Sequence, residues 1–143
     1  MIKNERQHRI TRSRADEVRR SIAELANAPL PEGLDPGMRD MQFDALRSVL
    51  TDLEGDLADY DALHQTTLFE ATGLGQLPLT LIRARIARGF TQRQLAERIG
   101  LPEQALQRYE ATDYAGVSFA RLVEIADALE VTIHYDVRLS EAG

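Results

Sequence analysis

A short stretch of the chain, residues 91–110, concentrates amide, carboxylate and guanidinium side chains on two helical patterns separated by Gly100. Amide and guanidinium groups form paired hydrogen bonds with base edges and phosphates, so nucleic-acid recognition is the first chemistry to consider. The alternative is a helical hairpin that only packs and keeps its polar side chains in water. The candidate contact residues are Thr91, Gln92, Glu103, Gln104, Gln107 and Arg108.

The spacing within this stretch predicts how these residues are positioned. Thr91 followed three residues later by Gln94 forms a capping-box pattern, so a helix should begin at Gln92 with its first N–H groups directed at an anion. Gly100 permits a left-handed turn, and Pro102 presets the backbone angle for the start of a second helix. This order of elements predicts a helix-turn-helix.

The flanking sequence predicts further elements. An apolar helical pattern ends at Gly89, and Ser118 can cap another helix that continues to Leu129. Apolar and polar residues then alternate from Val131 to Leu139, which predicts a terminal strand with one apolar face. A second, shorter β-prone run spans 66–69.

The predicted helices resemble a known family. The run RARIARGFTQRQLAERIGLPEQALQRYE, with the later SFARLVEIADALEV, is similar to the Cro/CI-type helix-turn-helix regulators, also called XRE. The resemblance implies that Thr91 and Gln92 contact phosphates while Glu103, Gln104 and Arg108 approach base edges in the major groove. It also implies a structural ion pair between two further residues, Arg85 and Glu110.

Two residues depart from the family pattern. Pro102 replaces the serine or threonine that commonly caps the recognition helix, and Glu103 places a carboxylate where an amide or hydroxyl is usual. A carboxylate can accept a hydrogen bond from cytosine but repels phosphate. The longer layout, with its N-terminal helical segment, resembles both HigA-like antitoxins and stand-alone XRE regulators. The resemblance to antitoxins implies a toxin as a second partner.

The N-terminal half predicts a helical hairpin. Thr11 or Ser13 can cap a first helix, and Asp35 with Pro36 can begin a second that continues to His64. The second helix would be about 43 Å long and the first little more than half that length. Part of the apolar seam on the second helix would therefore have no partner within the hairpin, and a second copy of the chain or another protein could cover it. The seam residues in that part are Leu50, Leu53, Leu57 and Tyr60.

Charge is unevenly distributed along the 143 residues, whose net charge is −6. Residues 35–64 contain eight carboxylates against two arginines, so the acidic face belongs to the hairpin rather than to the helix-turn-helix. An alternative function follows: the hairpin neutralises a basic toxin, and DNA binding is secondary or absent.

Several classes of function find no support in the sequence. The chain has no cysteine, and its three histidines lie in different segments without metal-ligand spacing. No nucleophile and base are paired by spacing, and no segment approaches the roughly 20 apolar residues of a membrane span. We therefore expect a cytoplasmic protein that is not an enzyme and uses no metal or cofactor.

Together these observations predict a mainly α protein with short β-strands at the linker and the C-terminus. We expect a helical hairpin over 1–65, a linker over 66–77 and a helix-turn-helix domain with a terminal strand over 78–143. The expected function is that of a homodimeric repressor, which binds a double-stranded DNA operator and regulates its own operon as an antitoxin. The hairpin, the strand or both join the copies; the strand would contribute Ile133, Tyr135 and Val137.

Overall fold

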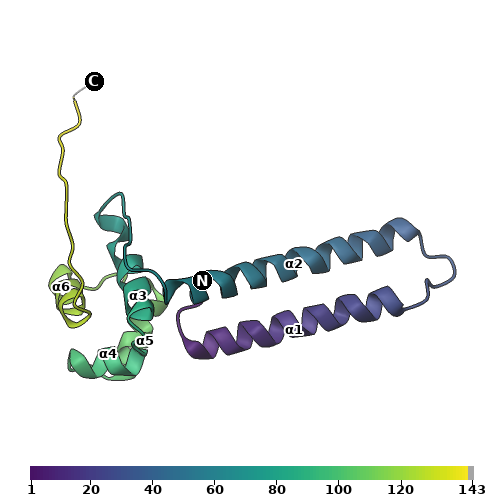
Figure 1. The fold of residues 1–143 in the computed structure, drawn as a ribbon, viewed down its shortest axis with the longest axis horizontal. Coiled ribbons are helices and arrows are strands. Elements are labelled where there is room, and N and C mark those ends of the chain that lie inside the picture. Colours follow the sequence, from purple (N-terminus) through teal and green to yellow (C-terminus); the bar gives the residue numbers. More distant parts are fainter. Residues whose placement is uncertain (142–143) are drawn as a thin grey trace. The chain divides into compact units, whose positions relative to one another are not determined.

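The computed structural model describes residues 1–141, which form two compact units with their boundary between Glu70 and Ala71. Six α-helices and one short 3-10 helix make up the secondary structure of these residues (Figure 1). Among the described residues, no helix is both long and apolar enough to cross a membrane.

The first unit is an antiparallel hairpin of α1 (Glu5–Asn27) and α2 (Pro36–Leu63) (Figure 1). Its seam on α1 repeats at intervals of three and four residues, with Ala15 fully buried and Val18, Ile22 and Leu25 half-buried. Two helices cover only one face of each other, so most apolar residues in the hairpin keep part of their surface in water. The hairpin core is therefore thin.

The first helix begins earlier than the sequence predicted. Its cap is Asn4, whose side chain accepts a hydrogen bond of 2.8 Å from the Gln7 N–H, and Thr11 lies inside the helix. The prediction of Thr11 or Ser13 as the cap was wrong because Asn4 already satisfies an N-terminal N–H one turn from the chain start. Consequently α1 has 23 residues against 28 in α2.

Because α1 is longer than predicted, it reaches the C-terminal end of α2. The rings of His8 and Tyr60 lie 5.0 Å apart, and His8 Nε2 lies 3.1 Å from Asp61 Oδ1. At the opposite end, the Arg39 guanidinium donates to the carbonyl oxygens of Leu25 and Ala28. The expected unpaired end of the seam is thus covered within the chain.

The second unit contains the short 3-10 helix η1 (Leu74–Gln76) and four α-helices. These are α3 (Leu77–Ala87), α4 (Gln92–Arg98), α5 (Glu103–Ala111) and α6 (Phe119–Ala128). Each of the four α-helices contributes to one core, in which the largest fully buried apolar side chains are Leu81, Ile82, Ile86, Leu95, Leu106, Ile125 and Leu129. This core fixes α4 and α5 relative to each other.

The predicted β-strands are wrong: residues 1–141 contain none. Residues 131–141 leave α6 as an extended segment (Figure 1), and the side chains of Tyr135, Val137 and Leu139 are 53%, 90% and 96% exposed. Alternating polarity favours a strand only where a partner backbone completes the ladder. The other run, 66–69, forms no strand either, and no ladder joins the two.

Candidate nucleic-acid interface

The start of α4 is fixed by local hydrogen bonds. Thr91 Oγ1 accepts from the Gln94 N–H at 3.1 Å, and Gln94 Oε1 accepts from the Thr91 N–H at 2.9 Å. The predicted capping box is therefore confirmed. It defines where the helix begins and how its first turn is oriented.

A tight turn joins α4 to α5. Gly100 has φ of 71°, in the left-handed region that favours glycine, and the Leu101 N–H donates to the Ala96 carbonyl at 2.9 Å. Pro102 then occupies the N-cap of α5 and provides no side-chain hydrogen bond. As a result α5 begins at Glu103, immediately after the turn.

The two faces of α5 differ in composition. Leu106 and Glu110 are fully buried, whereas Glu103, Gln104, Gln107 and Arg108 are exposed. Gln107 Nε2 donates a hydrogen bond to Glu103 Oε1 at 3.2 Å, so these two side chains are partners of each other. Within the described residues, the side chains of Gln104 and Arg108 form no hydrogen bond or ion pair. Two side chains that can form bidentate bonds with bases therefore lie one turn apart and face solvent.

Comparison with known proteins agrees with this geometry. Residues 81–135 match the family model described as helix-turn-helix. The chain carries a helix-turn-helix domain. The match is of the XRE type and supports a DNA-binding transcriptional regulator, a class that is generally not enzymatic. Searches of curated proteins and of solved structures give no match.

A buried polar network connects the helices of the helix-turn-helix domain. Arg85 Nε lies 2.7 Å from Glu110 Oε1 and 3.0 Å from Oε2, with both side chains almost completely buried. Arg85 Nη1 donates to the Phe90 carbonyl at 2.7 Å. The ion pair that the family resemblance implied is present, and it links α3 to the end of α5.

Gln92 belongs to this network rather than to the exposed surface. Its residue is only 7% exposed, and its Nε2 donates to Glu110 Oε2 at 3.2 Å. The sequence indicated a phosphate contact for this residue, but a glutamine at the first position of a helix can turn either way. Nothing in the local sequence distinguishes the two orientations, because the carboxylate is contributed by another helix.

Sequence reasoning missed Tyr114, in the loop that follows α5. Asp113 and Tyr114 have φ of 50° and 58°, and the Tyr114 N–H donates to the Tyr109 carbonyl at 2.7 Å. Burial raises the pKa of the Tyr114 phenol well above its usual range, and the nearby Glu110 carboxylate raises it further. The uncharged ring therefore fills the core beside Tyr109 and holds the C-terminal end of α5.

The remaining predicted site residues lie away from the helix-turn-helix surface. Leu50, Leu53 and Leu57 are half-buried and Tyr60 is buried on the hairpin, where the helical register directs them toward α1. In the C-terminal extended segment, Ile133 is half-buried whereas Tyr135 and Val137 are exposed. The predicted dimer residues thus occupy two different units.

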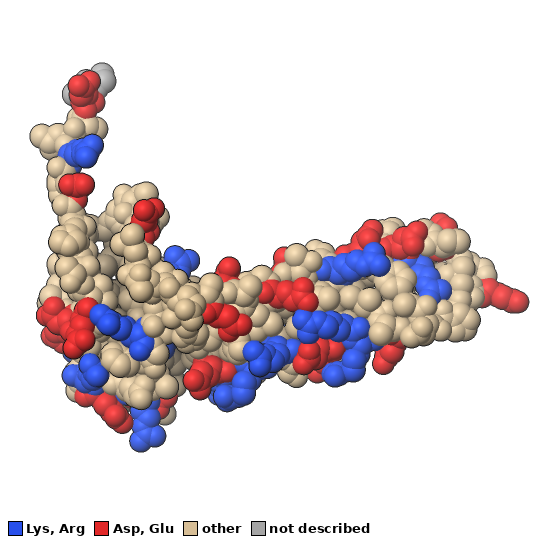
Figure 2. Space-filling model, in the orientation of Figure 1, with Lys and Arg blue, Asp and Glu red and all other residues tan. Residues whose placement is uncertain are grey.

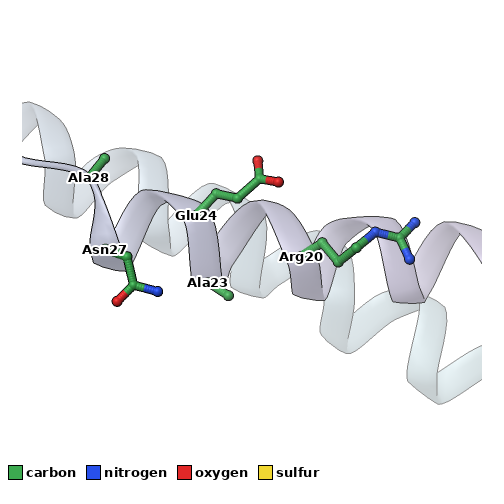
Figure 3. Close-up of a pocket in the computed structure, with 5 residues that line it drawn as sticks. All are labelled: Arg20, Ala23, Glu24, Asn27 and Ala28. Atoms are coloured by element: carbon green, nitrogen blue, oxygen red, sulfur yellow. The ribbon is translucent and has the colours of Figure 1, made fainter.

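Shallow depressions occur in both units of the described structure. A shallow depression near the C-terminal end of α1 is lined by residues of that helix and its cap (Figure 3), and its polar groups do not converge on a common point. These are Arg20, Ala23, Glu24, Asn27 and Ala28. Within residues 1–141, no group of histidine and acidic side chains could hold a metal ion.

Proposed function

We propose that the protein is a sequence-specific repressor that places α5 in the major groove of an operator. The observation that carries this proposal is the exposed pair Gln104 and Arg108, which lacks partners within the described residues. Glutamine can bond bidentately to adenine and arginine to guanine, each pairing giving about 1–3 kcal/mol of discrimination. The buried side of α5 supports the proposal because it holds the helix in one orientation.

The family resemblance implies phosphate contacts at Thr91 and Gln92, and we propose that the contact at Gln92 is made by the backbone instead of the side chain. Thr91 is exposed at the cap of α4, while the Gln92 side chain is bonded to Glu110. We assign the contact at Gln92 to its backbone N–H, which stands in the first turn of the helix. Such a contact positions the protein without reading sequence.

Selection of duplexes from a randomised library tests the proposed function directly. Full-length protein should enrich a short sequence motif, and Gln104→Ala and Arg108→Ala should each alter the enriched bases. Arg121→Ala is the matched control, because Arg121 lies on α6 and pairs with Glu124 at 2.7 Å. Failure of the wild-type chain to enrich any sequence would exclude sequence-specific recognition.

We also propose that the repressor acts as a homodimer. Support comes from the exposed apolar side chains of the C-terminal extended segment, including Tyr135 and Val137. A twofold dimer would present two recognition helices to half-sites roughly 34 Å, or one helical turn, apart. Light scattering that finds a monomer both free and on a single half-site would reject this arrangement.

A second proposed function, that of an antitoxin regulating its own operon, rests on α2. This helix carries seven carboxylates against two arginines. Three of them, Asp52, Asp56 and Asp59, are exposed and form no ion pair within residues 1–141. Such a surface fits a basic protein partner.

Isothermal titration with a small basic protein from the adjacent reading frame tests the antitoxin proposal. The variant Asp52→Asn/Asp56→Asn/Asp59→Asn should lose toxin binding and keep DNA binding.

A further inference from the structure

We propose that α1 contains a second DNA-contacting surface, which binds phosphates flanking the operator. This surface, the arginine patch, consists of Arg6, Arg9 and Arg12, which follow one another at intervals of three residues. The inference rests on the proposed DNA-binding function of the helix-turn-helix domain, and it assigns to the hairpin a role that neither the family match nor the seam explains.

The position of the arginine patch follows from the packing of the hairpin. His8, Thr11 and Ala15 lie on the face of α1 that packs against α2. At 3.6 residues per turn, Arg6 and Arg9 project from the opposite side of the helix and Arg12 lies on the adjoining flank, and all three are exposed. Figure 2 shows basic side chains on the surface along the hairpin, with acidic side chains among them.

The arginines of the patch differ from Arg19 of the same helix in having no carboxylate partner among the described residues. Arg19, two turns beyond Arg12, lies 2.7 Å from both Asp16 and Glu54. By contrast, none of the three patch guanidinium groups forms an ion pair or hydrogen bond in the part of the chain that the structure describes. Between Glu5 and Arg14, the only acidic residue is Glu5 itself.

This arrangement is unfavourable for the isolated helix. Positive side chains near the N-terminus of a helix oppose its macrodipole, and like charges three residues apart repel each other, as at Arg6, Arg9 and Arg12. No contact within the hairpin offsets these costs. An external polyanion would offset both, which is why the pattern points to a ligand rather than to a solvated face.

Duplex DNA fits this requirement better than a generic acidic surface. It carries one negative charge per roughly 1.7 Å, and guanidinium groups bond phosphate oxygens with defined geometry. The acidic α2 lies behind α1, and a helix diameter of about 10–12 Å exceeds the Debye length of about 8 Å. Repulsion between α2 and phosphates at the patch is therefore largely screened.

The salt dependence of DNA binding by the full chain tests the inference. The probe is a fluorescein-labelled duplex of arbitrary sequence and about 40 base pairs, because phosphate contacts do not depend on sequence. Each lost phosphate contact should reduce the slope of log K against log salt by about 0.9. Arg6→Gln/Arg9→Gln/Arg12→Gln should therefore flatten the slope by up to about 2.7 and weaken binding at least tenfold near ~0.1 M salt.

Two control variants show whether the change in slope comes from charge at the patch. One keeps the charges at the patch, and the other removes a charge elsewhere in the hairpin. Arg6→Lys/Arg9→Lys/Arg12→Lys keeps the charges and should retain the wild-type slope. Arg47→Gln removes one charge from α2, where Arg47 lies 3.9 Å from Asp44, and should change the slope less than Arg9→Gln. Circular dichroism of each variant should show the helix content of the wild type.

The outcomes separate this inference from the proposed function. A wild-type chain that binds no duplex would overturn both. Wild-type binding with an unchanged slope in the glutamine variant would overturn the arginine patch alone and leave recognition by α5 standing. If that variant instead loses a salt-sensitive dimer in light scattering while its slope is unchanged, the patch binds the acidic α2 of a second copy, and the assignment to DNA is wrong.

Discussion

The two units of the chain use similar residues to different effect. In the helix-turn-helix domain, Leu95, Leu106 and Ile125 are fully buried, and the pair Arg85 and Glu110 is almost completely buried as well. In the hairpin, the apolar seam is mostly half-buried, and the cross-helix pair Arg19 and Glu54 has side chains that are 46% and 48% exposed. An arginine–glutamate ion pair should therefore contribute strongly to the stability of the helix-turn-helix domain and little to that of the hairpin.

The sharpest test of this difference removes one carboxylate from each unit. Glu110→Gln should destabilise the helix-turn-helix domain by about 3–5 kcal/mol, because it leaves Arg85 buried without its counter-charge. Glu54→Gln should change hairpin stability by only about 0–1 kcal/mol, since water already screens that pair. Hydrogen exchange of amides in α5 and in α2 reports the two units separately.

A double variant sharpens the same comparison. Arg85→Met/Glu110→Gln should be less destabilising than Glu110→Gln alone, because no uncompensated charge stays buried. Additive effects of the two substitutions would show that the residues are not energetically coupled.

Apolar truncation should also differ between the units. Leu81→Ala removes a fully buried side chain and should cost about 2–5 kcal/mol. Leu53→Ala on the half-buried seam should cost distinctly less, because the neighbouring water can fill the space that is vacated. Equal losses of protection by hydrogen exchange would mean that the seam is enclosed in solution, as a dimeric hairpin would require.

A smaller effect is expected at the recognition surface. Arg108→Ala should weaken binding to the enriched operator by about 1–3 kcal/mol while leaving the unfolding free energy nearly unchanged. Fluorescence anisotropy with the enriched duplex and a scrambled duplex measures it. Equal weakening on both duplexes would assign Arg108 to phosphate rather than to a base.

The smallest effect concerns the start of α1. Asn4→Ala should cost about 1 kcal/mol, because the Gln7 N–H loses its acceptor. Thr11→Ala, at the cap first predicted, should cost less. The helix content from circular dichroism, followed during thermal melting, distinguishes them; a larger loss at Thr11 would contradict Asn4 as the cap.

These comparisons show which features the sequence could predict. The capping box at Thr91 and the turn at Gly100 depend on residues within five positions of each other, so the local sequence pattern was enough to predict them. The cap at Asn4 was not predicted because several capping residues compete there. The extended segment at Tyr135 was interpreted as a strand because its alternation is local, whereas a ladder requires a partner. The inward turn of Gln92 likewise depends on a carboxylate from another helix.

The contact of Arg39 with the last carbonyls of α1 has a consequence for engineering the chain. Arg39 holds the hairpin at its loop end, and the contacts of His8 with Tyr60 and Asp61 hold it at the other. The register of the two helices is thus maintained by side chains rather than by the length of the connection, residues 28–35. That connection is a natural place to insert a reporter peptide, or to open the chain and create new termini, without disturbing either helix.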